Sequence, residues 1–121
     1  MKEIILPWPD RKLHPNARVH WAVRARAAKA ARQYAWTLGW AHSLHREHWP
    51  DGRIDVHIMG YRPTARKTDR DGLLSALKPS LDGLADAMGV DDSRFVPHPD
   101  IADEVRKGGE VRIQITTGEQ A

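Results

Sequence analysis

Residues 53–88 read RIDVHIMGYRPTARKTDRDGLLSALKPSLDGLADAM, and they combine a strand pattern with a helix pattern. Its first part, residues 53–61, alternates apolar and polar side chains, a period of two that predicts a half-buried strand. Its last part, residues 71–88, repeats leucine at helical spacing and predicts a helix with one apolar face. Pro79 lies inside the helical pattern and lacks a backbone N–H, so a kink or a restart of the helix is expected there. The stretch therefore predicts a strand and a helix that bury their apolar faces in one core.

Further elements are expected on both sides of this stretch. The alanine-rich residues 19–48 favour a long helix, because alanine loses no side-chain entropy when it becomes ordered. The shorter elements are a strand at 2–6, an extended segment at 95–104, and a last strand at 110–116 that follows a turn at 107–109. The order β-α-β-α-β-β predicts an α+β fold, with two main helices against a small mixed β-sheet, in a single domain over residues 1–121.

The long helix is expected to place one residue per turn against the core. The residues at that spacing are Val23, Ala27, Ala30, Tyr34, Leu38 and Ala41. The following residues 49–52, WPDG, predict a turn that ends the helix.

Composition excludes several classes of protein. No apolar run approaches the roughly 18 residues that a membrane-spanning helix needs. The first residues, MKEIILP, lack the long apolar stretch and the cleavage site of a signal peptide. The chain has no cysteine, which excludes disulfides and cysteine-ligated zinc. A cytoplasmic protein that does not bind membranes is expected.

Charge is distributed unevenly, although the net charge is only +3. Residues 11–32 contain no acid, and their basic residues are Arg11, Lys12, Arg18, Arg24, Arg26, Lys29 and Arg32. In residues 82–104 the acids outnumber the single base Arg94, and they are Asp82, Asp86, Asp91, Asp92, Asp100, Asp103 and Glu104. A basic surface suits a polyanion, since Lys and Arg neutralise phosphates, and an acidic one suits a divalent cation. A solvated charged surface without a partner accounts for the charge alone equally well.

Two carboxylates, Asp69 and Asp71, lie where the strand and loop give way to the helix. Side chains two apart in an extended segment point to the same side and repel each other unless a cation lies between them. Mg²⁺ prefers such oxygen ligands and binds through a few carboxylates plus substrate phosphates. Asp91 and Asp92 follow the helix, which can return the chain to the same site. Helix N-capping is the alternative, because Asp is a preferred cap, but one cap does not account for both pairs.

A magnesium site with a lysine beside it fits phosphodiester hydrolysis. The metal polarises the phosphoryl oxygen and lowers the pKa of the attacking water, and Lys78 is a candidate to stabilise charge on the phosphate. Residues 69–72, DRDG, also match the middle of an EF-hand calcium loop. That loop is excluded, because Lys67 and Lys78 would stand at its first and last ligand positions.

The order Asp69-x-Asp71, Lys78-x-x-x-Asp82-Gly83-Leu84 and Asp91-Asp92 resembles the pattern of the RusA-like Holliday-junction resolvases of phages and prophages. The segments LPWP at 6–9 and KGG at 107–109 are similar to the opening and the close of that family. Similarity therefore spans most of the chain and is weakest between residues 10 and 50. Gly72 stands where the family usually has Asn, which removes a possible hydrogen bond to a ligand, and the spacing from Asp71 to Lys78 is longer than usual.

The resemblance implies a homodimeric endonuclease that resolves Holliday junctions by paired, symmetric cuts in branched DNA. It implies a catalytic set of Asp69, Asp71, Lys78 and Asp92, with Mg²⁺ (or Mn²⁺ in its place) bound by Asp69, Asp71, Asp92 and Asp91. A twofold dimer matches the twofold symmetry of a four-way junction. The protein would act in the cytoplasm of a bacterial host cell.

DNA is expected to contact the basic residues of 11–32 together with Arg62, Arg66, Lys67 and Arg70, which flank the acidic site. The five tryptophans are expected to pack rather than to stack on bases, and Trp36 and Trp40 are the candidates for a dimer interface. A transition-metal site at His42, His45 and His48 lacks a carboxylate or cysteine partner, so surface histidines are expected.

Two other functions stay open. One is a branched-DNA-binding protein without catalysis, although a pure binder does not need the complete set of Asp69, Asp71, Lys78 and Asp92. The other is a nuclease for flaps or forks, which the sequence does not separate from a resolvase.

Overall fold

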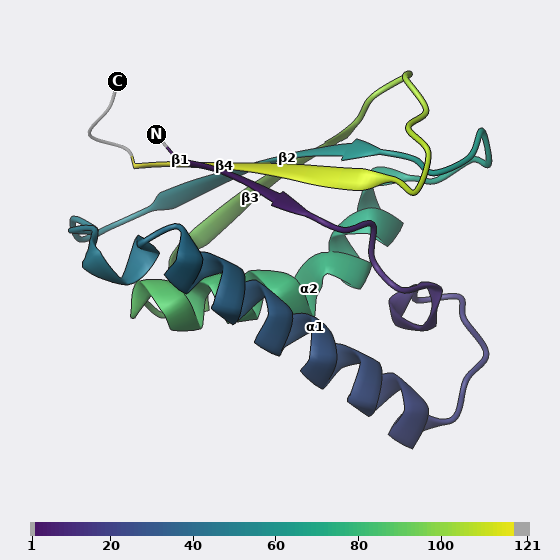
Figure 1. Cartoon of the computed structure of the whole chain (residues 1–121), viewed down its shortest axis with the longest axis horizontal. Helices are drawn as coiled ribbons and strands as arrows, with labels where there is room; N and C mark the ends of the chain where they lie inside the picture. The colour runs from purple at the N-terminus through teal and green to yellow at the C-terminus, as the bar shows by residue number, and fades with distance from the viewer. Residues whose placement is uncertain (1, 118–121) are drawn as a thin grey trace.

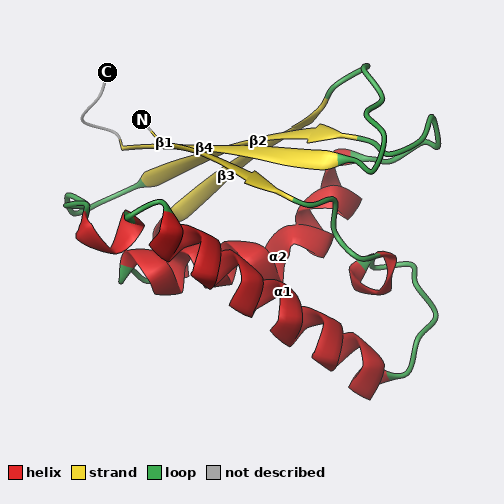
Figure 2. Ribbon diagram, viewed as in Figure 1, coloured by secondary structure: helices red, strands yellow, loops and turns green. Residues whose placement is uncertain are grey.

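The described residues, 2–117 of the computed structural model, form four strands, two α-helices and three short 3₁₀ helices. In chain order they are β1 (Lys2–Leu6), η1 (Arg11–Leu13), α1 (Trp21–Ala41), η2 (Leu44–Arg46), β2 (Ile54–Tyr61), α2 (Arg70–Met88), η3 (Asp92–Arg94), β3 (Phe95–Ile101) and β4 (Glu110–Thr117). The sheet forms one layer, and both α-helices cover the same face of it as a second layer (Figures 1 and 2). The predicted α+β fold with a small sheet and two main helices is confirmed.

The sheet is mixed, with the strand order β1-β4-β2-β3. Strand β4 pairs antiparallel with both β1 and β2, whereas β3 pairs parallel with β2. A parallel pair needs a crossover connection, and α2 provides it. Pro97 and Pro99 lie in β3, which tolerates them because it is an edge strand.

The core lies between the sheet and α2. In β2 the apolar set Ile54, Val56 and Ile58 is buried, as the period of two predicts. The leucines of α2 pack against these strand residues, and the buried ones are Leu73, Leu77, Leu81 and Leu84. The alternate residues of each strand face away from the helices, so the sheet has one open face.

Helix α1 differs from the expected helix in its length and in its buried face. It ends at Ala41, because Ser43 adopts a left-handed conformation with a φ of 60°. The expected core face is wrong in part, since the Tyr34 side chain is 55% exposed, whereas Ala35 and Gly39 are buried. Alanines occupy most sides of this helix, so its periodicity does not identify the side on which α2 packs.

Helix α2 runs from Arg70 to Met88 through Pro79, so the predicted restart does not occur. The carbonyl that proline leaves without a donor belongs to the exposed Ser75, where water can satisfy it. Gly89 ends the helix with a left-handed φ of 71°. Among residues 2–117, neither helix combines the length and the apolar character that crossing a membrane requires.

Candidate functional site

Lys78 lies at the centre of a group of charged side chains on the exposed side of α2. Its Nζ donates to Asp82 Oδ1 at 2.8 Å and to Asp92 Oδ2 at 2.5 Å. Asp82 comes from the next turn of α2, and Asp92 comes from η3, which begins three residues after the helix C-cap Gly89. Two segments therefore bring two carboxylates to one ammonium group.

These groups stabilise one another's charged forms. The hydrogen bond and positive charge of Lys78 hold the pKa of Asp92 below its ordinary value, with a smaller contribution from Asp82. Hydrogen bonds to Asp82 and then to Asp92 raise the pKa of Lys78, against the opposing effect of desolvation. The site therefore holds a carboxylate anion and an ammonium cation at neutral pH.

Replacing Lys78 with methionine is expected to raise the pKa of Asp92 toward its ordinary value of 3.8. A carboxyl group with a depressed pKa stabilises the folded state above its unfolded pKa, and this stabilisation is lost as the pH falls through the folded value. The variant should therefore be less stable than wild type at neutral pH, and the difference should vanish in acid. Carbon-detected NMR titration of the side-chain carboxyls measures the shift. Glu110, whose pKa is lowered mainly by Arg112, should titrate unchanged.

Asp69 and Asp71 lie at the N-terminal end of α2. Asp69 is the N-cap, and its Oδ1 accepts the Gly72 N–H at 2.6 Å. Asp71 is exposed in the first turn and lies on the same side of the helix as Lys78 and the half-buried Asp82, because spacings of seven and eleven residues return to the same side of an α-helix. Two helical turns, roughly 10 Å along the axis, separate Asp71 from Lys78.

The predicted ligands thus lie in two places, with Asp69 and Asp71 at the start of α2 and Asp91 and Asp92 at η3. Within residues 2–117, no three His, Asp or Glu side chains form a group that could hold a metal ion. Asp91 caps η3, where its Oδ1 accepts the Ser93 N–H at 2.8 Å. The expectation that capping accounts for only one carboxylate is therefore wrong, since both Asp69 and Asp91 are caps. Asp71, Asp82 and Asp92 are not helix caps.

The predicted DNA-binding residues divide into two sets. Four of them are held by other groups of the protein: Arg24 by the carbonyls of His14 and Ala17, Arg32 by Asp86, Arg62 by the carbonyls of Ala65 and Asp103, and Arg70 by Asp100. The others are exposed and form no side-chain hydrogen bond or ion pair with residues 2–117, and they are Arg11, Lys12, Arg18, Arg26, Lys29, Arg66 and Lys67. This second set is available to an anionic partner.

An ion pair between Arg32 of α1 and Asp86 of α2 joins the two helices beside these carboxylates. The Arg32 guanidinium contacts both oxygens of Asp86, at 2.7 and 3.0 Å, and this hydrogen bonding raises the pKa of Arg32. The sequence interpretation placed Asp82 and Asp86 in the acidic stretch of residues 82–104, and Asp82 in the resolvase pattern, but it gave neither residue a role as metal ligand or catalyst. Their spacing of four and eight residues from Lys78 was the available signal, because it places them on the same side of the helix.

Gly72 stands where the resolvase pattern usually has Asn, and two side chains lie close to it. A Cβ at this position would lie 2.6 Å from Asp69 Oδ1 and 2.9 Å from His14 Nε2. A Cβ here would therefore require the Asp69 carboxylate and the His14 imidazole to shift. No sequence pattern pointed to His14, because the loop that carries it is far from α2 along the chain.

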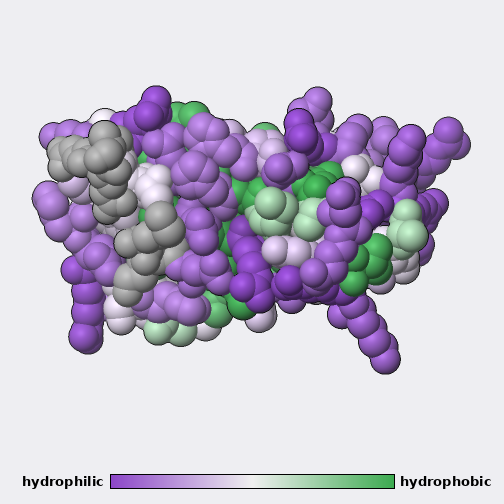
Figure 3. Space-filling model, turned by 90° about the horizontal axis from the view of Figure 1, so that it is seen from above, coloured by the Kyte–Doolittle hydropathy of each residue, from purple (hydrophilic) through white to green (hydrophobic). Residues whose placement is uncertain are grey.

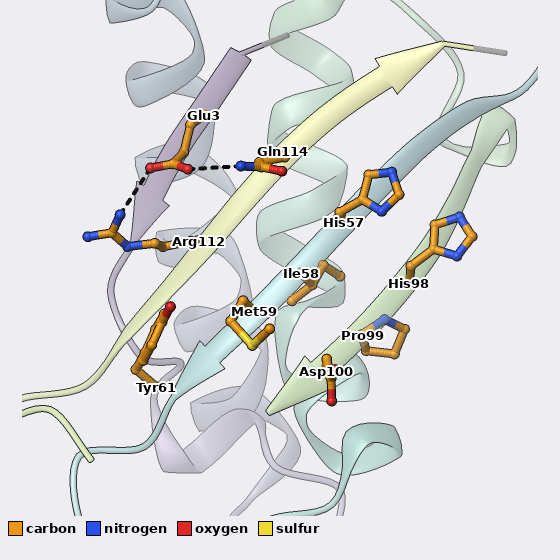
Figure 4. A pocket seen from close by; sticks show the side chains of 10 residues that line it. All are labelled: Glu3, His57, Ile58, Met59, Tyr61, His98, Pro99, Asp100, Arg112 and Gln114. Atoms are coloured by element: carbon orange, nitrogen blue, oxygen red, sulfur yellow. Dashed lines mark hydrogen bonds and ion pairs between the residues drawn. The ribbon is translucent and has the colours of Figure 1, made fainter. Parts of the chain in front are cut away.

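The open face of the sheet carries a groove of about 550 Å³ (Figure 4). Seen from above, most of the surface on this side is hydrophilic (Figure 3). His57 and His98 stack there with ring centroids 4.9 Å apart, and His98 Nε2 lies 2.8 Å from Asp55 Oδ1. The groove includes none of the predicted catalytic residues.

The tryptophans differ in burial, and the histidines near the C-terminal end of α1 differ in their contacts. Trp8 and Trp49 pack against the core as expected, whereas Trp36 and Trp40 are 41% and 46% exposed with ring centroids 5.5 Å apart. His45 stacks on Trp40, His42 caps α1, and His48 is exposed.

No protein-family model matches the chain. A protein of Xylella fastidiosa (strain Temecula1), described as an "Uncharacterized protein", is 50% identical over 121 aligned residues. The alignment covers 96% of this chain and 76% of the relative. At that identity and coverage, the chain belongs to the same family as this uncharacterized protein of Xylella fastidiosa.

Proposed function

We propose that the protein is a magnesium-dependent, structure-specific DNA endonuclease that resolves Holliday junctions by paired phosphodiester cleavage. The observation that carries the proposal is the contact of Lys78 with two carboxylates, Asp82 from the next turn of α2 and Asp92 from η3. Carboxylates around a lysine are the groups that metal-assisted phosphodiester hydrolysis needs.

The residues present fit a hard divalent cation. Asp82 and Asp92 already direct their oxygens at one cation, the Lys78 ammonium. Mg²⁺ takes one or two carboxylates from a protein and completes its shell with waters and substrate phosphates. Asp82 and Asp92 are the residues that would hold it, whereas Asp71 lies roughly 16 Å from Asp82 along the helix axis. The bound ion supplies a polarised phosphoryl oxygen and a water of lowered pKa.

Lys78 is suited to bind the phosphate that is cleaved. A lysine ammonium has three N–H donors, and two of those of Lys78 are used by Asp82 and Asp92. The third is free to donate to a phosphate oxygen. Its charge is maintained by the two carboxylates, so it can stabilise the negative charge that develops on the phosphate in the transition state.

The exposed, unpaired basic residues would bind the DNA backbone. Each phosphate that such a residue neutralises adds about 0.9 to the salt dependence of binding, because condensed counterions are released. Replacing Arg66 and Lys67 with glutamine is therefore expected to reduce the slope of log K against log salt by roughly 2. Arg32→Gln should leave that slope unchanged, since Arg32 is held by Asp86. Equal slopes for all three proteins, measured by fluorescence anisotropy with a labelled junction, would exclude Arg66 and Lys67 from the interface.

The proposal includes a homodimer in the bacterial cytoplasm. Two subunits related by a twofold axis can each cut one strand of a four-way junction. Trp36 and Trp40 are candidates for the subunit interface, because they form an exposed aromatic pair on α1.

The test is cleavage of a labelled four-way junction with Mg²⁺, Mn²⁺ or EDTA, beside flap, fork and linear duplex controls. Wild type should make paired cuts near the crossover only with metal, and Asp92→Asn should bind the junction without cutting it. Binding without cleavage under either metal would favour the branched-DNA-binding protein. Faster cutting of flaps or forks than of junctions would reassign the substrate.

A further inference from the structure

We infer that Trp21, the first residue of α1, stacks on an unpaired base of DNA, so that the protein prefers DNA with unpaired bases to a linear duplex. The inference deepens the proposed function and rests on it for the partner, DNA. It is carried by the exposure of Trp21 and by the unpaired basic residues around it.

The first observation is that Trp21 does not pack. Its side chain is 75% exposed, more than any other exposed large hydrophobic side chain within residues 2–117. In the same part of the chain its indole N–H has no hydrogen-bond partner, and the ring beside it is that of His20, with centroids 5.6 Å apart. The expectation that all five tryptophans pack is therefore wrong for Trp21, whose indole is open to a partner.

The second observation is the positive charge around this indole. Of the seven exposed basic residues that form no hydrogen bond or ion pair with residues 2–117, five lie at most ten residues from Trp21, and they are Arg11, Lys12, Arg18, Arg26 and Lys29. Residues 11–32 contain no acid that could neutralise them. An aromatic side chain among cations suits a polyanion that also carries aromatic groups, and unpaired DNA combines the two.

The third observation is that the segment around Trp21 is held in place. Arg24, one turn further along α1, donates to the carbonyls of His14 and Ala17 at 3.2 and 2.8 Å. His20 caps the helix through Nδ1, which accepts the Ala22 N–H at 3.1 Å. These bonds tie the loop before α1 to its first turn. A surface that is already ordered loses little conformational entropy when it binds.

Stacking on Trp21 would separate branched from linear DNA. In a linear duplex each base is covered by its neighbours, whereas an unpaired base can offer its face to an aromatic side chain. The first turn of α1 lies at the end of the helix that points away from the sheet (Figure 1) and roughly 16 Å along the axis from Arg32. Loss of Trp21 should therefore change DNA binding rather than the chemistry at Lys78.

The experiment measures the affinity of Trp21→Ala and Trp21→Phe for an oligothymidylate of about ten nucleotides and for a blunt linear duplex, both without metal. Stacking on one base corresponds to about a 5- to 100-fold change in affinity. Trp21→Ala should lose such a factor on the oligothymidylate and less than about twofold on the duplex, where phosphate contacts dominate. Trp21→Phe should keep most of the affinity, because phenylalanine also presents an aromatic ring.

Tyr34→Ala is the matched control. Tyr34 is also an exposed aromatic residue of α1, with a side chain 55% exposed. Its neighbours one turn away are uncharged, and they are Ala30, Ala31, Thr37 and Leu38. Tyr34→Ala should bind both DNAs as wild type does. Equal losses in Tyr34→Ala and Trp21→Ala would point to a general effect of apolar surface and would overturn the inference.

Salt dependence separates stacking from phosphate contact. Trp21→Ala removes no charge, so the slope of log K against log salt on the oligothymidylate should stay unchanged. Arg18→Gln should reduce that slope by about 0.7, the contribution of one phosphate contact to a single strand. A slope reduced by the same amount in Trp21→Ala would mean that the variant disturbs the cations, and would contradict stacking.

Tryptophan fluorescence separates failure of this inference from failure of the proposed function, because it does not require cleavage. The oligothymidylate should quench the fluorescence of wild type more than that of Trp21→Phe. If wild type does not cleave junctions but this difference and the loss of affinity in Trp21→Ala are found, the endonuclease is wrong and the stacking stands. If wild type cleaves junctions and Trp21→Ala binds the oligothymidylate as tightly as wild type, the stacking is wrong and the endonuclease stands.

Discussion

Asp92→Asn is expected to lower the magnesium-dependent rate of junction cleavage by on the order of 10³-fold, with junction binding changed less than about threefold. Asparagine keeps the shape of the side chain but removes the charge that now lies 2.5 Å from the Lys78 ammonium. A catalytic metal ion contributes several kcal/mol to transition-state stabilisation, and each 1.36 kcal/mol is a factor of about ten in rate. Single-turnover cleavage at saturating protein measures the effect without interference from binding.

Asp86→Asn is the matched control for this variant. Asp86 lies on the same side of α2 and is also an exposed carboxylate in an ion pair, but its partner is Arg32 rather than Lys78. Its replacement should change the cleavage rate by only a few fold. Equal losses in both variants would point to a general electrostatic effect of the acidic surface, and an unchanged rate in Asp92→Asn would remove Asp92 from the site.

Gly83→Ala is expected to lower the free energy of unfolding by about 2 to 3 kcal/mol, the cost of inserting a methyl group into a closely packed interface. A Cβ at Gly83 would lie 2.1 Å from the carbonyl oxygen of Arg32 and 3.1 Å from Ala35 Cβ. Both neighbours belong to the middle of α1, so the helices must move apart. The higher helix propensity of alanine returns only about 1 kcal/mol.

Ser75→Ala is the control for the propensity gain, because Ser75 is exposed on the same helix. It should leave stability unchanged or slightly raise it. Urea unfolding followed by circular dichroism compares the two variants with wild type. A Gly83→Ala protein as stable as wild type would show that α1 and α2 can separate without loss of core packing.

Most of the secondary structure could be predicted, because it depends on interactions within a few residues. The period of two in β2 and the leucine spacing in α2 both identify the buried faces correctly. The buried face of α1 could not be predicted in this way. Its alanines are nearly equivalent in hydrophobicity, and the contact is decided by small residues, Gly39 against Ala87 and Ala35 against Gly83.

The candidate site was predicted in its residue types more than in its arrangement. Lys78 and Asp92 do meet, as the resolvase pattern implies for a common site. Asp69 and Asp91 serve as caps, and Asp82 joins Lys78 instead. Capping depends on backbone geometry at a helix end, which the spacing of carboxylates alone does not specify.

Which residues share a side of each strand and helix, and which segments carry positive or negative charge, can be read from the sequence. These properties follow from the backbone periods of 2 and 3.6 residues, which act locally. The contacts between distant segments cannot be read in this way: η3 lies at Lys78, Arg32 at Asp86, and His14 near Gly72. The physical reason is that such contacts depend on how the sheet and both helices pack around one core, and that packing is a property of the whole chain.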